Sequence, residues 1–327
     1  MSIDLELRIP KHIIKKEIED VLIPMGWVVN PKYENCYTWY HMDNYQSIRG
    51  VWLYLKYYSS EKKTSTTITT STSAGRSYED LFTQNNTLKI LKKIYGGYIY
   101  NPQTGTRSYI TNDIPKLQAS EKALGFVYSA FHDNLLKTSI IIEDVPEQIL
   151  SADSYIAELN KELLRNNMIV PFLVTTLETF LKYTFIRYLE TNESARDQVF
   201  KKNDKIHFSK LKSLLEGQIS ISSLETENYN FQNLISANEA FKKYLEIDLF
   251  EILNTSKKFN KRIVVLREVI TKMLDSRHKF IHEGIIDYKL SRVEMEKYIF
   301  CLNSFGELFV DRLLTLKNLR IDFKKYI

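Results

Sequence analysis

The spacing of apolar residues changes near Pro146, and this change divides the chain into two parts that cannot share one secondary structure. Before Pro146, short stretches rich in Tyr, Trp and Thr alternate with helical segments, which predicts an α+β domain over residues 1–145. After it, apolar residues recur every three or four positions with almost no strand signal. This pattern predicts an all-helical bundle over residues 146–327. A chain of 327 residues is long enough to build both domains.

In the first part we expect helices over residues 11–23 and 79–94 and strands over residues 26–30, 36–42, 50–58 and 98–100. The threonine-rich stretch 64–73 is interpreted as a polar edge strand with frayed ends, or else as a loop. Threonine favours extended backbone, but little in this stretch is suited to burial. We expect the aromatic residues around it to fill a core rather than to form a surface on which bases stack.

Composition limits the compartment and the chemistry. The two cysteines, Cys36 and Cys301, are far apart and outside any CxxC spacing, which indicates neither a disulfide framework nor a structural zinc site. The N-terminus lacks the apolar core of a signal peptide, and no long apolar window indicates a membrane span. We therefore expect a cytoplasmic protein without membrane contact. The net charge of +5 permits contact with phosphate backbones without requiring it.

The segment richest in groups that can bind anions or transfer protons lies in a helix expected over residues 260–282. Its buried stripe is formed by Ile263, Leu266, Ile270 and Met273, and the next position of the stripe is Arg277. An arginine does not occupy a core position unless it is paired or faces a polar cleft. His278 and His282 continue the neighbouring row just before Gly284, which can end the helix. The helix face therefore changes from apolar to cationic at its C-terminal end.

These three side chains suit the cleavage of RNA by its own 2′-hydroxyl, which leaves a 2′,3′-cyclic phosphate. Histidine transfers protons near neutral pH, and arginine binds phosphate through two parallel hydrogen bonds. The reaction needs neither metal nor cofactor, and we expect none. In an ideal helix Arg277 and His282 point about 140° apart. The site therefore needs a bent arginine, a loosened helix end or the same segment of a second subunit.

The segment from Arg277 to His282 resembles the motif of the HEPN superfamily of ribonucleases. That motif is an arginine, usually followed by a polar residue, with a histidine four to six residues after the arginine. Arg277, His278 and His282 match these three positions. Glu178 is similar to the acidic residue that the family carries in an earlier helix. The resemblance implies a helical bundle, a homodimer whose two motifs line one cleft, and roles in toxin–antitoxin systems, abortive infection against phage, or RNA processing.

The resemblance also implies a role for each residue. His282 is expected to be the principal acid and base, His278 the orienting or second proton-transfer group, and Arg277 the phosphate clamp. Glu178 is expected to orient or neutralise Arg277. RNA is the expected substrate. By analogy, residues 1–145 act as a sensor, a substrate-selecting domain or a docking surface, for example for an antitoxin or a phage-derived trigger.

Three other interpretations stay open. The chain could be a catalytically silent HEPN-like module that binds a nucleotide, RNA or a partner protein. His278 and His282 with Glu283 could bind zinc, although the HExxH pattern of metalloproteases is absent. In the purely structural interpretation, Arg277 pairs with Glu178 or Asp275, and the histidines are ordinary helix-end residues.

Overall fold

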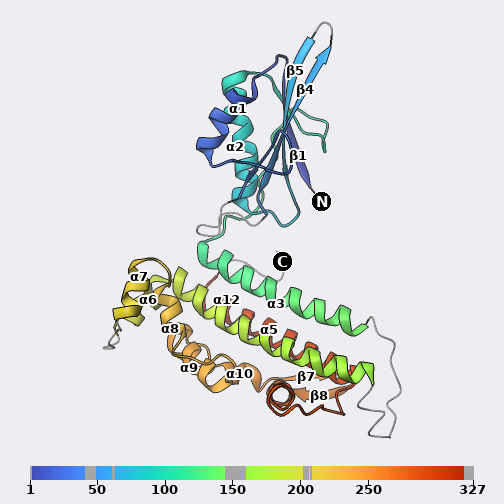
Figure 1. Cartoon of the computed structure of the whole chain (residues 1–327), viewed down its shortest axis with the longest axis vertical. Helices are drawn as coiled ribbons and strands as arrows, with labels where there is room; N and C mark the ends of the chain where they lie inside the picture. The colour runs from blue at the N-terminus through green and yellow to red at the C-terminus, as the bar shows by residue number, and fades with distance from the viewer. Residues whose placement is uncertain are drawn as a thin grey trace. The chain divides into compact units, whose positions relative to one another are not determined.

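The computed structural model describes residues 2–40, 49–60, 63–143, 160–201, 206 and 208–319. Two compact units are present, the first ending at Ala119 and the second beginning at Ser120. The first contains an antiparallel sheet with two helices, and the second is mostly helical, as Figure 1 shows. This order of an α+β part and a helical part confirms the expectation from sequence.

The boundary between the units lies earlier than the one placed near Pro146, which is outside the described residues. The reason is the helix α3 (Ala119–Glu143), which belongs to the second unit. Its buried side chains include Phe131, which stacks on Phe180 with 4.3 Å between the ring centroids. Because this apolar face packs on another helix of the second unit, α3 joins the helical core rather than the sheet.

The sheet of the first unit has the strand order β2-β3-β4-β5-β1-β6, and neighbouring strands are antiparallel. The strands are β1 (Ile3–Ile9), β2 (Val28–Val29), β3 (Cys36–Trp39), β4 (Val51–Ser60), β5 (Lys63–Thr72) and β6 (Tyr98–Tyr100). The helices α1 (Lys15–Leu22) and α2 (Tyr78–Tyr95) cover one face (Figure 1), and a 3-10 turn, η1 (Ile23–Met25), follows α1.

The core of the first unit lies between the two helices and the sheet. Alternate residues of β1 and β4 point into it, and they meet apolar residues of α1 and α2; the buried members include Leu5, Leu7, Val51, Leu53, Ile18, Leu22, Leu88 and Leu91. Trp27, Tyr37 and Trp39 are buried there too, as expected. Tyr54 and Tyr58 lie on the opposite face and are exposed, and Tyr40 is exposed too, so the expectation of an aromatic core is wrong for these three.

The threonine-rich strand β5 is not an edge strand, because it lies between β4 and β1. Thr66, Thr70 and Thr72 are fully buried. Each hydroxyl has a partner: Thr66 accepts from the Ile13 amide, Thr70 donates to the Leu5 carbonyl, and Thr72 bonds to the Gln84 amide oxygen. Burial of a hydroxyl is tolerated when it is hydrogen-bonded, which explains how so polar a strand occupies the middle of a sheet.

The second unit is built around four long helices, α3, α5 (Lys161–Thr191), α11 (Leu266–His278) and α12 (Arg292–Lys317). Shorter helices connect them: α6 (Glu193–Phe200), α7 (Phe208–Leu215), α8 (Ile221–Thr226), α9 (Leu234–Leu245) and α10 (Leu249–Leu253). The irregular spacing of apolar residues over 220–229 predicts a loop, but this stretch contains α8. The helix α5 continues through Pro171.

The second unit is not all-helical, because a β-hairpin precedes α11. The strands β7 (Ser256–Phe259) and β8 (Arg262–Val265) pair through a turn in which Asn260 and Lys261 have φ angles of 45° and 67°. Two positive φ angles in succession define the tight hairpin turn that matches strand twist. The expected helix therefore begins at Leu266 instead of residue 260. Ile263, which we placed on the buried stripe, is 78% exposed on the hairpin.

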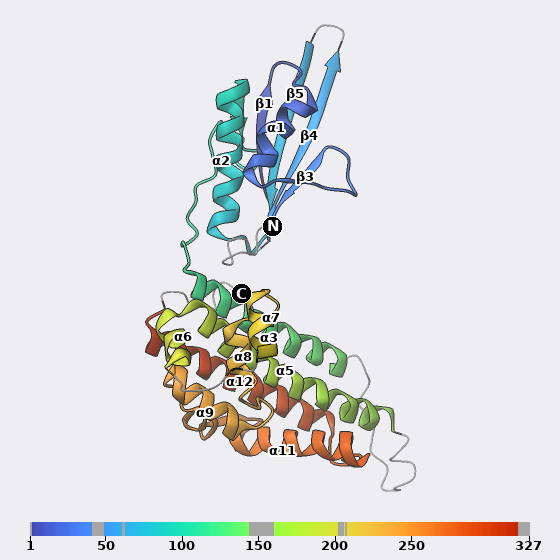
Figure 2. The same cartoon turned by 60° about the vertical axis from the view of Figure 1, so that its left-hand side comes forward.

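Aromatic rings join the long helices of the second unit, which run side by side in Figure 2. Phe180 of α5 contacts Phe131 of α3 at 4.3 Å and Phe309 of α12 at 5.4 Å between ring centroids. A side chain at Gly306 would meet Phe131 at 2.5 Å, so α12 approaches α3 closely only because residue 306 is glycine. The helix α5 is apolar and long enough to cross a membrane, but 56% of its most apolar window is buried, as in the core helix of a soluble domain.

Candidate active site

Arg277 and His278 lie in the last turn of α11, and His282 lies in a π-helical turn over Lys279–Glu283. Leu266, Ile270 and Met273 are buried as the stripe predicts. Arg277, the next position, is half-buried, whereas His278 and His282 are exposed. The helix therefore changes from a packed face to an accessible cationic end, as the sequence indicates. Gly284 ends the π-turn with a φ of 68°.

The π-turn changes the direction of His282 relative to Arg277. Hydrogen bonds in a π-helix reach one residue further than in an α-helix, so each residue turns through a smaller angle. Two residues five positions apart then point closer to the same side than the about 140° of an ideal α-helix. A loosened helix end, one of the three solutions considered above, is therefore present in the chain.

The two histidines form a pair. Their ring centroids are 4.8 Å apart and the ring planes are inclined by 47°. Both rings are accessible to solvent, so they can exchange protons with a bound substrate. Within the described part of the chain, the Arg277 guanidinium has no hydrogen bond or ion pair, and the pairing assumed by the structural interpretation is not formed. Its donors are available to an anion.

Glu178 is not close to this group. Its carboxylate accepts a hydrogen bond of 2.8 Å from the Gln232 side chain. Glu178 lies eleven residues after Asn167 on α5, which corresponds to about 16 Å along a helix axis. Asn167 of α5 contacts the segment just after the π-turn, through Asp287. The structure therefore places the His278 and His282 rings in contact at the end of α11 where Arg277 also lies, and leaves Glu178 elsewhere on α5.

Three polar residues in the first turns of α5, which the sequence analysis missed, hold the chain between the π-turn and α12. Asn167 donates to the Asp287 carbonyl at 3.2 Å and accepts from the Asp287 amide at 2.8 Å. Asn166 donates to the Leu290 carbonyl at 2.8 Å, and Glu162 accepts from the Arg292 amide at 3.1 Å. All three side chains are buried, so their removal leaves backbone groups without partners. The signal in the sequence is a polar cluster, ELLRNN, where an apolar helix begins.

We expect the Asn167→Ala substitution to lower the free energy of unfolding of the second unit by about 1–3 kcal/mol, because it leaves the amide and the carbonyl of Asp287 without their hydrogen-bond partner. Chemical denaturation followed by circular dichroism measures this change. Thr175→Ala, at an exposed position of the same helix, is the matched control and should leave stability nearly unchanged. Equal stability of the two variants would show that the contact with Asp287 is not needed.

A buried tyrosine lies beside Ser276 at the C-terminal end of α11. Tyr298 of α12 is 1% exposed, and burial raises its pKa to about 12. Its phenol is therefore neutral near pH 7 and unsuited to act as a base. Ser276, next to Arg277 in the chain, donates to the Asp287 carboxylate at 3.3 Å. His278 and His282 are exposed at this end of α11 and can transfer protons, and the side chains of Asp275, Lys279 and Glu283 are exposed beside them.

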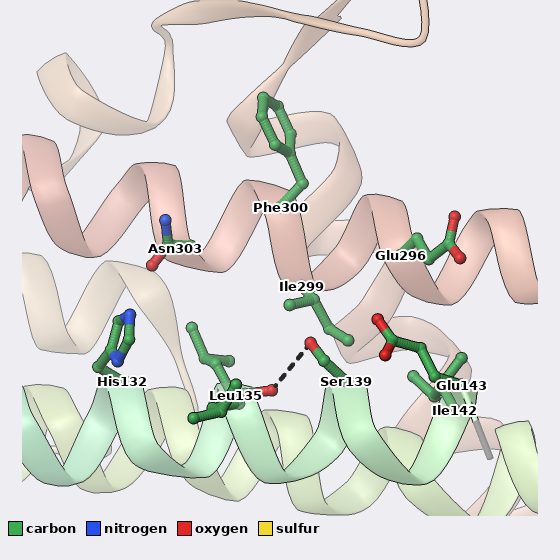
Figure 3. Close-up of a pocket in the computed structure, with 10 residues that line it drawn as sticks. His132, Leu135, Ser139, Ile142, Glu143, Glu296, Ile299, Phe300 and Asn303 are labelled. Atoms are coloured by element: carbon green, nitrogen blue, oxygen red, sulfur yellow. Dashed lines mark hydrogen bonds between the residues drawn. The ribbon is translucent and has the colours of Figure 1, made fainter.

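A separate cavity of about 300 Å³ lies between α3 and α12. Figure 3 shows His132, Ser139 and Glu143 on α3 facing Glu296 and Asn303 on α12. None of the residues expected in the active site lines it. In the described part of the chain, no three His, Cys, Asp or Glu side chains are placed to hold a metal ion together.

Comparisons with known proteins give no significant match to a protein-family model, a curated protein or a solved structure. The resemblance to HEPN ribonucleases therefore rests on the segment from Arg277 to His282 and on its helical setting.

Proposed function

We propose that the chain is a metal-independent endoribonuclease of the HEPN type that acts in the cytoplasm as a toxin or an antiphage effector. One observation carries the proposal: two adjacent exposed histidines share one helix end with an arginine that has no partner among the described residues. These groups can hold a phosphate and transfer two protons, as cleavage of RNA by its 2′-hydroxyl requires.

In this mechanism His282 removes the proton of the 2′-hydroxyl, and the oxygen attacks the adjacent phosphorus. The bond from phosphorus to the 5′-oxygen breaks, and that oxygen takes a proton from the acid. His278 orients His282 or supplies this second proton, because the two rings are in contact. Arg277 binds the equatorial phosphate oxygens, whose charge increases in the transition state. The products are a 2′,3′-cyclic phosphate and a free 5′-hydroxyl.

We propose that the active form is a homodimer whose two motifs share a cleft. Large apolar side chains are exposed in and after the π-turn: Ile281 by 48%, Ile285 by 50% and Tyr288 by 45%. Met168, which follows Asn167 on α5, is 68% exposed. Exposed apolar residues grouped beside a polar site are typical of an interface between subunits.

We expect the purified chain to cleave total RNA in the presence of EDTA and to leave DNA of the same length intact, because DNA lacks the 2′-hydroxyl. Gel electrophoresis detects the fragments. Treatment with a phosphatase that does not open cyclic phosphates should leave the 3′ ends blocked until acid opens them. Chelator-sensitive cleavage would contradict the metal-independent mechanism. Binding of RNA without any cleavage would support the silent module instead.

A further inference from the structure

The sheet of the first unit has one face that no helix among the described residues covers, and aromatic and basic side chains gather on it. Tyr54 and Tyr58 of β4 are 37% and 56% exposed. Trp52 stacks on Tyr54 with an angle of 8° between the rings. On β6, at the edge of the sheet next to β1, Tyr98 and Tyr100 point to the same face as Tyr54 and Tyr58, because the buried residue between them, Ile99, points into the core.

The strand register defines a groove on this face. Lys56 pairs with Thr67, Thr67 with Arg8, and Arg8 with Tyr98, so these side chains form one row across four strands. Thr67 of β5 and Arg8 of β1 occupy the middle of the row, and Lys56 and Tyr98 occupy its ends. A groove of about 370 Å³ lies over this row; Ser65, Thr67 and Thr69 form its floor together with Glu6 and Arg8 of β1, and Tyr58 and Tyr98 stand at its sides. Its walls are about 14 Å apart, three strand spacings.

Cations accompany the rings. The Arg8 guanidinium lies 3.8 Å from the centre of the Tyr100 ring, and the Arg107 guanidinium lies 4.4 Å from that of Tyr98. Glu6 pairs with Arg8 at 2.7 Å, whereas Lys56 has no ion pair in the described part of the chain. The groove therefore presents excess positive charge beside flat aromatic surfaces, with hydroxyl groups between them.

We propose that this groove binds single-stranded RNA, with bases stacked on Tyr58 and Tyr98 and the phosphates held by Lys56 and Arg107. Aromatic rings on an open sheet give unpaired bases a surface to stack on, and basic groups beside them hold the backbone. A duplex keeps its bases stacked on one another and cannot use these rings. The groove would then deliver substrate to the proposed nuclease, and this delivery role rests on the proposed function; the binding itself does not.

The test measures binding of a fluorescein-labelled, single-stranded 2′-O-methyl RNA of mixed sequence to the full chain by fluorescence anisotropy. The methyl group blocks attack by the 2′-oxygen, so binding is measured without cleavage. Loss of one stacked base should raise the Kd of Tyr58→Ala at least about five-fold, while Tyr58→Phe keeps the Kd of the unchanged chain. Lys56→Gln should weaken binding and reduce the salt dependence of log Kd by about one.

Phe82→Ala is the control, because Phe82 is an exposed aromatic residue of α2, on the helical side of the sheet. A second measurement follows tryptophan fluorescence. Trp27 and Trp39 are buried at 1% and 8% exposure, so quenching of tryptophan fluorescence by the oligonucleotide should come from Trp52 and should disappear in Trp52→Phe. An unchanged Kd in Tyr58→Ala, or equally tight binding of the duplex, would overturn the proposal.

The two proposals fail separately. If RNA is cleaved but binding of the oligonucleotide does not depend on Tyr58, the groove is not the RNA site and the nuclease proposal stands. If binding depends on Tyr58 and Lys56 as expected but RNA stays intact, the groove is an RNA site and the nuclease proposal fails.

Discussion

Replacement of His282 by alanine is expected to lower the rate of RNA cleavage by about 10²- to 10⁴-fold, the range for loss of a general acid or base. His282 is exposed and its ring packs on that of His278, so the substitution removes little packing and should leave stability nearly unchanged. Single-turnover cleavage of a defined RNA measures the effect. His132→Ala, at an exposed histidine of α3, is the matched control. Cleavage by His282→Ala at the rate of the unchanged chain would place the chemistry elsewhere.

Mixing variants shows whether two subunits complete one site. A chain with Arg277→Ala and a chain with His282→Ala are each expected to be inactive. If a cleft takes its arginine from one subunit and its histidine from the other, mixing the two variants restores part of the activity, because the mixed dimer contains one intact combination. No recovery in a preparation shown by sedimentation to contain mixed dimers would mean that each chain carries a complete site.

Replacement of Phe180 by alanine is expected to lower the free energy of unfolding of the second unit by about 3–5 kcal/mol, the usual cost of truncating a buried phenylalanine. Phe180 is 2% exposed and contacts Tyr128, Phe131 and Phe309. The loss therefore removes the ring that joins α5 to both α3 and α12. Denaturation by guanidinium measures it, with separate transitions for the two units if they unfold independently.

The control for this substitution is Phe208→Ala on α7, where the ring is 89% exposed and contributes little to packing. A loss below about 1 kcal/mol in Phe180→Ala would mean that the neighbouring rings close the cavity almost completely.

Patterns within a short stretch of sequence predicted the elements whose burial follows from the spacing of their own residues. The three-and-four spacing of α11 predicted the buried Leu266, Ile270 and Met273 and the accessible histidines after them. The strand β1 also alternates, as IDLELRI, and a stricter search for period two would have found it. In β5, composition misled the prediction, because the partners of its buried hydroxyls lie on other elements.

The surroundings of the candidate site could not be predicted in this way. The contact of Asn167 with Asp287 spans 120 positions, and no local period indicates such a pair. Glu178 was chosen because the family has an acidic residue in an earlier helix. Which end of α5 lies beside the motif depends on how the helices pack, and the sequence pattern does not give that packing. The hairpin before α11 had a local signal, Asn260 before β-branched residues, which the helical pattern around it obscured.

The π-turn at the end of α11 also bears on how such a motif can change in evolution. A single π-turn corresponds to an α-helix with one residue inserted, and the wider turn absorbs the insertion. The side chains of Arg277 and His282, five residues apart, therefore point in nearly the same relative directions as two side chains four residues apart on an ordinary α-helix. Relatives that lost one residue between Lys279 and Ile281 would present the same two side chains from a regular α-helix. Variation in the length of the motif is then compatible with one unchanged arrangement of arginine and histidine.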